Sequence, residues 1–286
     1  MFRAVRILSC SLYAAFLIGC GSPDRNDPVT PDAPDQHQFD DAPPQMGDNS
    51  RVYAHSGSTL YRIDTANLAP IMIGTMAGLG TQSLTDLAID KNDHMVGITL
   101  DKLYGIDATS GTVTLIKDLS QSAHGFTSLS YIPTDLTDPN SDDILVSAND
   151  QGNVFQIDPA TGTATSLGNY GTVALGQVRS SGDIVGIRGL GIYATVDVGD
   201  DPNQPDYLAK IDPTTWKATP IGAGTGFTRI FGLGYWAGKF YGFVDDGVGM
   251  GKMIMIDQNT GEGSLITAGP QRWYGAGVTT DAPILQ

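Results

Sequence analysis

The sequence has almost no glutamate, little positive charge and only two cysteines, Cys10 and Cys20, which both lie near the N-terminus, so no disulfide and no thiolate metal site is expected in the rest of the chain. Glu262 is the only glutamate among 31 acidic residues, whereas Asp and the 36 glycines, which favour turns over helices, are abundant. The 16 Lys and Arg residues form no basic cluster, and the formal net charge is −15, so nucleic-acid binding is not expected. Many short strands joined by tight turns are expected instead.

Long apolar runs are also scarce, and one of them lies at the N-terminus. Arg3 and Arg6 precede an apolar run from Ile7 to Gly19, which is the arrangement of a secretory signal and is too short for a stable transmembrane span. The run ends in Leu17-Ile18-Gly19-Cys20, which resembles the bacterial lipobox, where lipid is attached to the cysteine. The resemblance implies a lipoprotein signal peptide at residues 1–19 and lipidation of Cys20; a plain secretory signal is the alternative.

The segment after Cys20 is predicted to be a tether. Gly21 stands where an Asp would resemble an inner-membrane retention signal, so we expect a lipid-anchored protein of the cell envelope, at the outer membrane. Residues 20–50 are rich in Pro and Asp and cannot bury enough apolar surface to offset chain entropy, so they should stay disordered. The folded domain is expected at residues 51–286.

One sequence unit recurs five times in this domain. Each copy has an apolar segment that ends in Ile-Asp, a turn, and a second apolar segment. The aspartates are Asp64, Asp107, Asp158, Asp212 and Asp257. Such an Asp can accept the N–H groups of the turn that follows, so these five are predicted to make turns rather than to act in catalysis.

A second element, rich in small residues, also recurs five times. Its copies are Asp86–Ile89, Ser128–Tyr131, Gly176–Arg179, Gly232–Tyr235 and Gly275–Val278. Small residues suit the innermost strand of a propeller blade, where neighbouring blades converge. With the apolar stretches between the two elements, each unit holds four strands in roughly 43 to 54 residues, the size of a blade.

The two ends of the domain complement each other. The segment Val52–His55 has the pattern of a second strand without an inner strand before it, and Tyr274–Val278 that of an inner strand with nothing after it. Pairing them completes a blade and leaves no open edge. The sequence therefore predicts an all-β fold, a five-bladed β-propeller closed by its N- and C-terminal strands. Six blades are the alternative, if Leu190 to Asp206 forms strands of its own.

From Arg51 to Ala282 the repeats resemble the β-propeller superfamily, in particular its NHL, gluconolactonase-like and quinoprotein-like groups. The shared pattern is D-x-x-G-x-L-Y-x-I-D-x-x-T-G. The resemblance implies a ligand site at the mouth of the central channel, on the face where the loops enter the innermost strands. Candidate ligand-binding residues there are His124, Thr127, Arg229, Arg272 and Trp273. Arg229, Arg272 and Trp273 could hold an anionic or sugar ligand; the alternative is an inter-blade salt bridge beside a packed indole.

The same face carries two acidic loops. Ca²⁺ takes about six to eight oxygen ligands, so a calcium site is one interpretation and a pair of solvated loops is the other. The candidate metal ligands are Asp200, Asp201, Asp206, Asp245 and Asp246. No other cofactor is expected.

The shortage of glutamate also bears on activity. Gluconolactonase-like enzymes and five-bladed glycosidases use a Glu in their sites, whereas Glu262 follows Gly261 in an outer turn, so no catalytic residue is assigned. We expect a non-catalytic binding or scaffold propeller, monomeric and attached to the membrane by its lipid, with an unknown protein or saccharide ligand at the channel mouth. The alternative is a hydrolase, lactonase- or glycosidase-like, with a Ca-assisted or Asp-based site.

Overall fold

The computed structural model of the chain describes residues 50–119, 125–201 and 203–285. The chain divides into Met1–Pro44 and Gln45–Gln286, and the described residues belong to the second unit. These residues form β-strands, turns and loops without any helix. Among them, accordingly, there is no helix with the length and apolar character to cross a membrane.

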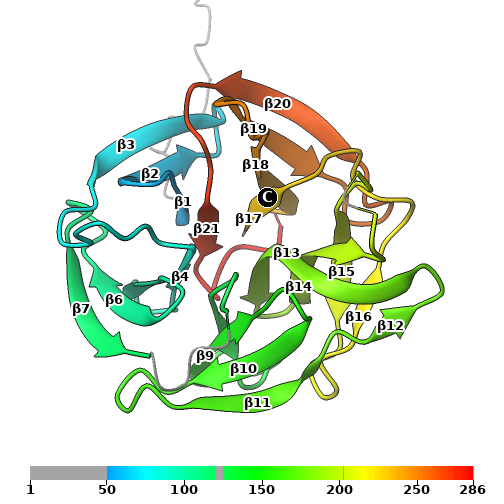
Figure 1. The fold of residues 1–286 in the computed structure, drawn as a ribbon, viewed down its shortest axis with the longest axis horizontal. Coiled ribbons are helices and arrows are strands. Elements are labelled where there is room, and N and C mark those ends of the chain that lie inside the picture. Colours follow the sequence, from blue (N-terminus) through cyan, green and yellow to red (C-terminus); the bar gives the residue numbers. More distant parts are fainter. Residues whose placement is uncertain (1–49, 120–124, 202, 286) are drawn as a thin grey trace, which may run out of the picture. The chain divides into compact units, whose positions relative to one another are not determined.

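Five antiparallel sheets stand around a common axis (Figure 1). Blade one has the order β21 (Gly275–Val278), β1 (Val52–His55), β2 (Thr59–Asp64), β3 (Ala69–Thr75). Blade two contains β4 (Asp86–Ile89), β5 (Met95–Ile98), β6 (Lys102–Ile106) and β7 (Val113–Asp118), and blade three contains β8 (Ser130–Pro133), β9 (Asp143–Ala148), β10 (Asn153–Ile157) and β11 (Ala164–Asn169).

Blade four contains β13 (Gly176–Ile187), β14 (Gly191–Val198), β15 (Tyr207–Ile211) and β16 (Ala218–Pro220), with the short β12 (Thr172–Val173) beside β13. Blade five contains β17 (Ile230–Trp236), β18 (Lys239–Asp245), β19 (Gly251–Ile256) and β20 (Gly263–Gly269). The innermost strands β21, β4, β8, β13 and β17 contact one another in a ring. We call the face where these five strands begin the mouth face.

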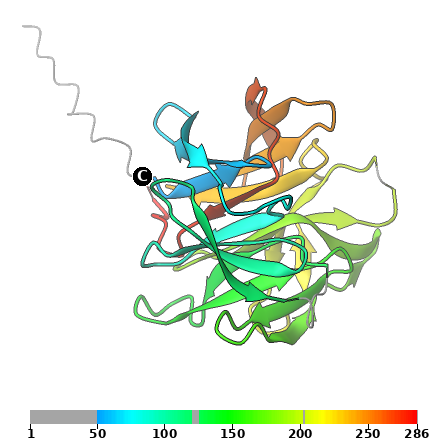
Figure 2. The same ribbon diagram turned by 60° about the vertical axis from the view of Figure 1, so that its left-hand side comes forward.

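The ends of the domain close the ring as predicted. Strand β21 pairs antiparallel with β1, with Val278 opposite Val52 and Gly275 opposite His55. The first sheet therefore takes its inner strand from the C-terminal end and its other three strands from the start of the domain (Figure 2). The prediction of a five-bladed, end-closed β-propeller is confirmed.

The five repeated aspartates make turns, as expected. Asp107, for example, accepts backbone N–H bonds from Thr109 (2.8 Å) and Ser110 (3.2 Å) through Oδ1. Asp64, Asp158, Asp212 and Asp257 accept from the corresponding positions of their turns. Each of them therefore fixes the connection between the third and fourth strands of a blade.

The predicted position of the inner strand of blade four was wrong. Both halves of β13 pair with β14, but only the second half is the inner strand, because Asp183 at its start binds the Leu233 N–H of the next innermost strand. The predicted inner element Gly176–Arg179 forms the first half of the same long strand. The segment Leu190 to Asp206, considered as extra strands, supplies β14 of the same sheet and the loop after it. A bulge between Ser180 and Ile184 lengthens this hairpin on the mouth face. The inner strand therefore begins later in the sequence than the spacing of the other repeats predicts.

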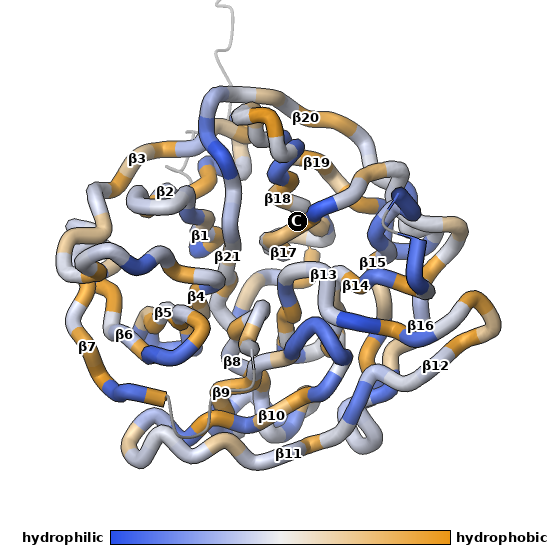
Figure 3. Tube along the Cα trace, in the orientation of Figure 1, coloured by the Kyte–Doolittle hydropathy of each residue, from blue (hydrophilic) through white to orange (hydrophobic). Residues whose placement is uncertain are grey.

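The core lies between the sheets rather than in one central mass. Hydrophobic colours recur on the strands of all five blades, and many loops are hydrophilic (Figure 3). Phe240, which is fully buried, packs against Tyr193 of blade four at 4.8 Å and Tyr235 at 4.9 Å between ring centroids. Burying each such side chain stabilises the fold by about 1.5–3 kcal/mol, so inter-blade packing holds the ring rigid around its axis.

Candidate functional site

A pocket of about 350 Å³ lies at the mouth of the central channel. All five blades contribute, because its walls come from the segments that begin the innermost strands and from one β5–β6 turn. We call it the mouth pocket and define it by Leu84, Leu100, Thr127, Ser181, Phe231 and Tyr274. Leu84, Leu100, Phe231 and Tyr274 give the pocket an apolar and aromatic surface, and Ser83, Thr85, Thr127 and Ser181 add hydroxyl groups to it.

Each of the two aromatic side chains in the wall of the mouth pocket, Phe231 and Tyr274, contacts the guanidinium group of an arginine. The guanidinium carbon of Arg229 lies 5.2 Å from the ring centroid of Phe231, and that of Arg272 lies 5.5 Å from the ring centroid of Tyr274. Both arginines also bind Asp245, whose side chain is fully buried. Cation–π contact and ion pairing together hold the two rings in place.

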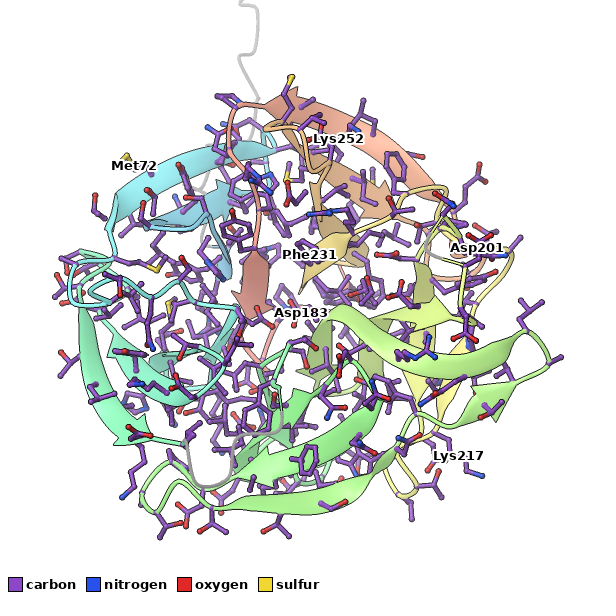
Figure 4. All side chains as sticks on the ribbon, in the orientation of Figure 1. Met72, Asp183, Asp201, Lys217, Phe231 and Lys252 are labelled. Carbon is purple, nitrogen blue, oxygen red and sulfur yellow. The ribbon has the colours of Figure 1, made fainter. Side chains whose placement is uncertain are left out.

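Below the mouth pocket, two carboxyl groups face each other inside the ring of innermost strands. Asp86 begins β4 and Asp183 lies within β13, and both are fully buried and hydrogen-bonded to each other. Figure 4 places Asp183 near the centre of the ring, beside Phe231 of the mouth pocket. The pair spans the axis between blades two and four.

Backbone N–H groups from neighbouring blades bind these carboxyl groups. Asp86 accepts the N–H of Leu87 at 2.8 Å through Oδ1 and that of Leu129 in blade three at 2.7 Å through Oδ2. Asp183 repeats the pattern with the N–H groups of Ile184 (2.6 Å) and Leu233 in blade five (2.7 Å). The two residues therefore hold the same position in blades two and four, and each ties its blade to the next.

Burial raises the pKa of both carboxyl groups well above the usual range, and the charge of Asp183 raises that of Asp86 further. Two carboxylates in contact away from water cannot both be ionised, so the pair retains a proton between its oxygens. This pair is a structural connection across the axis.

The other blades place small residues at the same position: Ser128, Gly232 and Gly275. Gly275 is required there, because a Cβ would clash with Asp86 Oδ1 and with His55 Nε2. His55 is also fully buried, and burial lowers its pKa to about 4, so this side chain adds no positive charge beside the carboxyl pair at neutral pH.

A second, polar pocket of about 420 Å³ adjoins the mouth pocket and shares Ser181 with it. It lies between β13, β14 and the segments that precede β15 and β17. We define the polar pocket by Arg179, Ser181, Asp197, Asp206, Thr228 and Arg229. Asp206 is buried at its base, and burial raises the pKa of this carboxyl to about 7.

The predicted ligand-binding residues occupy different places around the mouth. Thr127 lines the mouth pocket and Arg229 lines the polar pocket. Arg272 donates Nε and Nη2 to Asp245, and Trp273 is buried between Tyr61 and Phe243 at 5.3 and 5.5 Å. His124 and Cys20 lie outside the described residues.

The five candidate metal ligands have separate partners. Asp245 binds Arg229 and Arg272, and the Arg272 guanidinium lowers its pKa to about 2. Asp206 accepts from Ser181 and Ile230, Asp200 pairs with Arg179, and Asp201 and Asp246 accept backbone N–H groups of their own turns. Within the described ranges, no three His, Cys, Asp or Glu side chains are arranged to hold one metal ion.

The sequence reading missed Asp183, Asp197, Phe231 and Tyr274. A signal for Asp183 was present, because Asp183-Ile184-Val185-Gly186 repeats the Asp86-Leu87-Ala88-Ile89 pattern of an acid before apolar residues. No local pattern marks Asp197, Phe231 or Tyr274 as wall residues, since the pockets arise from segments that are distant in sequence.

No protein-family model matches the sequence, and no curated protein matches it significantly. Among solved structures, a protein of unknown function from Bacteroides thetaiotaomicron is similar, with a TM-score of 0.43, 16% identity, and coverage of 68% of this chain and 53% of the other. A gluconolactonase from Xanthomonas campestris gives a TM-score of 0.41, 15% identity, and coverage of 76% and 72%.

The Dos1 propeller gives a TM-score of 0.36 and 14% identity, with coverage of 74% of this chain and 55% of the other. The chain thus spans about half the length of the Bacteroides protein and of the Dos1 propeller. These likenesses are too distant to transfer any activity. By its own sheet topology, five sheets in a ring closed by β21 on β1, the chain has the fold of a five-bladed β-propeller.

Proposed function

We propose that the protein is a lipid-anchored binding protein of the cell envelope whose mouth pocket holds its ligand. The observation that carries this proposal is the mouth pocket itself, to which all five blades contribute and which has Leu84, Phe231 and Tyr274 among its walls. Ligand sites are concave, mainly apolar and fixed by a rigid scaffold, and their volumes begin at about 300 Å³. The pocket fits a compact ligand with an apolar or aromatic ring face.

Binding rather than catalysis is the role that this pocket supports. Asp86 and Asp183, which follow the wall residues Thr85 and Ser181 in the chain, are fully buried and engaged with backbone N–H groups and with each other. A general acid or base must reach the reacting group within hydrogen-bond distance, directly or through one water. A ligand in the mouth pocket would be separated from this pair by the residues that bury it.

Anchoring at the outer membrane through Cys20 is the second part of the proposal, and it is supported by the lipobox-like sequence Leu17-Ile18-Gly19-Cys20. A tether of residues 20–50 would hold a monomeric propeller away from the lipid surface. Cys20→Ala should abolish incorporation of radiolabelled palmitate and release the protein from the membrane fraction. Unchanged labelling or fractionation would show that Cys20 is not the anchor.

Ligand binding is tested by calorimetry with the detergent-solubilised full-length protein and the aryl probe 2-naphthol. Phe231→Ala removes one aromatic wall and should weaken binding by about tenfold, since an aromatic contact contributes about 0.5–1.5 kcal/mol beyond its buried area. Met72→Ala, at a side chain that is 60% exposed on β3, is the control and should leave binding unchanged.

Two results would contradict the proposal. Equal affinity of the Phe231→Ala and Met72→Ala variants for 2-naphthol would show that the mouth pocket is not the site. Steady release of nitrophenol from 4-nitrophenyl glycosides by the wild type would show that the protein is a hydrolase.

A further inference from the structure

The polar pocket combines donors and acceptors of both charge signs. Arg179 and Arg229 stand on its walls, and Asp197 and Asp206 lie between them. Hydroxyl groups come from Ser181 and Thr228. This composition differs from that of the mouth pocket next to it, so the two pockets suit different parts of a ligand.

The polar pocket contains a pair of carboxyl groups, those of Asp206, which is buried, and of Asp197, which is exposed. Asp206 is 1% exposed and accepts the Ser181 hydroxyl and the Ile230 N–H through Oδ2, the latter at 2.6 Å. Its carboxyl is also hydrogen-bonded to that of Asp197, which is exposed. Asp197 therefore presents a positioned carboxyl group to whatever occupies the pocket.

The two arginines are held by hydrogen-bond partners on one side, and both line the pocket. Arg179 donates Nη1 to the Gly199 carbonyl at 2.7 Å and Nη2 to Asp200, whose side chain is 88% exposed. Arg229 donates Nε and Nη2 to Asp245; among the described residues its Nη1 has no hydrogen-bond partner. Its guanidinium also lies over Phe231, so one residue connects the polar pocket with the aromatic wall of the mouth pocket.

We propose that the polar pocket is a saccharide subsite in which Asp197 and Arg229 bind the ring hydroxyls of a neutral sugar while Phe231 and Tyr274 stack against an apolar ring face of the same ligand. This inference rests on the proposed binding function and names its ligand class. Sugars combine hydroxyl groups, which both donate and accept, with C–H faces that pack on aromatic rings. The adjoining pockets offer a matching surface for each.

The charges in the pocket favour a neutral ligand. Asp200 and Asp201 also line this pocket, so four aspartates stand against two arginines and a multiply charged anion would meet net repulsion. An ammonium group could approach Asp197 but only donates hydrogen bonds, so it could not accept from the Nη1 group of Arg229, which has no hydrogen-bond partner among the described residues. A vicinal pair of hydroxyls can accept from a guanidinium and donate to a carboxylate at the same time.

The test uses calorimetry with detergent-solubilised full-length protein and three neutral probes, cellotetraose, maltotetraose and xylotetraose. At least one should bind, and Asp197→Asn, which keeps the side-chain size, should weaken that binding by about 10- to 150-fold, which corresponds to the loss of a charge-assisted hydrogen bond of about 1.5–3 kcal/mol. Asp138→Asn, an exposed turn residue in the β8–β9 loop on the opposite face, is the matched control and should bind like the wild type.

The outcomes separate this inference from the function on which it rests. If 2-naphthol binds and depends on Phe231 but no tetrasaccharide binds, or if Asp197→Asn leaves the saccharide affinity unchanged, the saccharide subsite is refuted and the mouth pocket stands. If 2-naphthol does not bind, the proposed function itself fails. Binding of spermidine in place of the tetrasaccharides, lost at high salt, would refute the saccharide subsite in favour of a cationic ligand.

Discussion

At the residue scale, the carboxyl pair in the ring of innermost strands makes stability depend on pH. Asp86 and Asp183 have raised pKa values in the folded protein because burial disfavours their charge, whereas in the unfolded chain each has a pKa of about 3.9. The folded state therefore binds more protons than the unfolded state above about pH 4, and its stability falls as pH rises from there towards the folded pKa values.

Asp183→Asn should reduce this dependence. The amide cannot ionise, but it can donate to Asp86, while the loss of one acceptor for the Leu233 N–H lowers overall stability. Chemical denaturation between about pH 4 and pH 8 should give a shallower decline in unfolding free energy for the variant than for the wild type. Asp138→Asn is the control, and its curve should run parallel to that of the wild type. A parallel curve for Asp183→Asn would disprove the shared proton.

Asp183 also shows where residue-level prediction stops. A carboxyl group before an apolar run is visible in the sequence, but its partner Asp86 lies two blades earlier and no local pattern relates the two. The contact exists because the ring brings equivalent positions of blades two and four towards one axis. The contact between Asp86 and Asp183 follows from the closed ring. The sequence analysis predicted the ring but not which side chains meet at its axis.

At the element scale, the hairpin between β17 and β18 is a two-residue turn with an unfavourable residue. Trp236 pairs with Lys239, and between them Ala237 has a φ of 50° and Gly238 a φ of 83°. Turns with two positive φ values favour Asn-Gly, because Asn tolerates the left-handed region better than Ala.

Ala237→Asn should therefore stabilise the protein by about 0.5–1 kcal/mol, which raises Tm by about 2–3 °C for a domain of this size. The Ala237 N–H bond to the Pro283 carbonyl is retained in this variant. Differential scanning calorimetry measures the change, and Gly238→Ala, which places a side chain at positive φ, is the opposite control with a lower Tm. An unchanged or lower Tm for Ala237→Asn would contradict the turn assignment.

The elements were predictable where the repeat is regular. The Ile-Asp segments mark the third strand of every blade because the Asp must accept the N–H groups of its turn. The inner strands of blades one, two, three and five were located from their small residues. In blade four the bulge after Ser180 lengthens β13, so Gly176–Arg179 has a suitable composition but lies outside the ring. The predicted inner strand of blade four was therefore placed too early in the sequence, and Asp183, which begins the inner half of β13, was missed.

At the scale of the whole molecule, closure by β21 on β1 connects the two ends of the domain. A chain that ends at Pro270 lacks β21 and leaves β1 and the inner strand of blade five without their neighbour. It also removes the Ala276 N–H that binds Asp86 at 3.2 Å. We expect this chain to lose its cooperative thermal transition and to aggregate, because exposed strand edges pair with other chains.

Circular dichroism melts and light scattering would measure both effects. The control lacks only residues 285 and 286, where the Leu285 side chain is 80% exposed, and should melt like the full chain. If the chain ending at Pro270 unfolded cooperatively at the same temperature as the full chain, closure would not be needed for stability.

The pairing of β21 with β1 also sets the order of events during synthesis. A chain made from its N-terminus exposes β1 early, but this strand waits for its partner until Gly275–Val278 emerges. Blades two to five can form beforehand, while the ring stays open and the carboxyl group of Asp86 lacks one of its backbone donors. The strand that is made last is therefore the one that completes the first blade, the ring of innermost strands and the set of donors around Asp86.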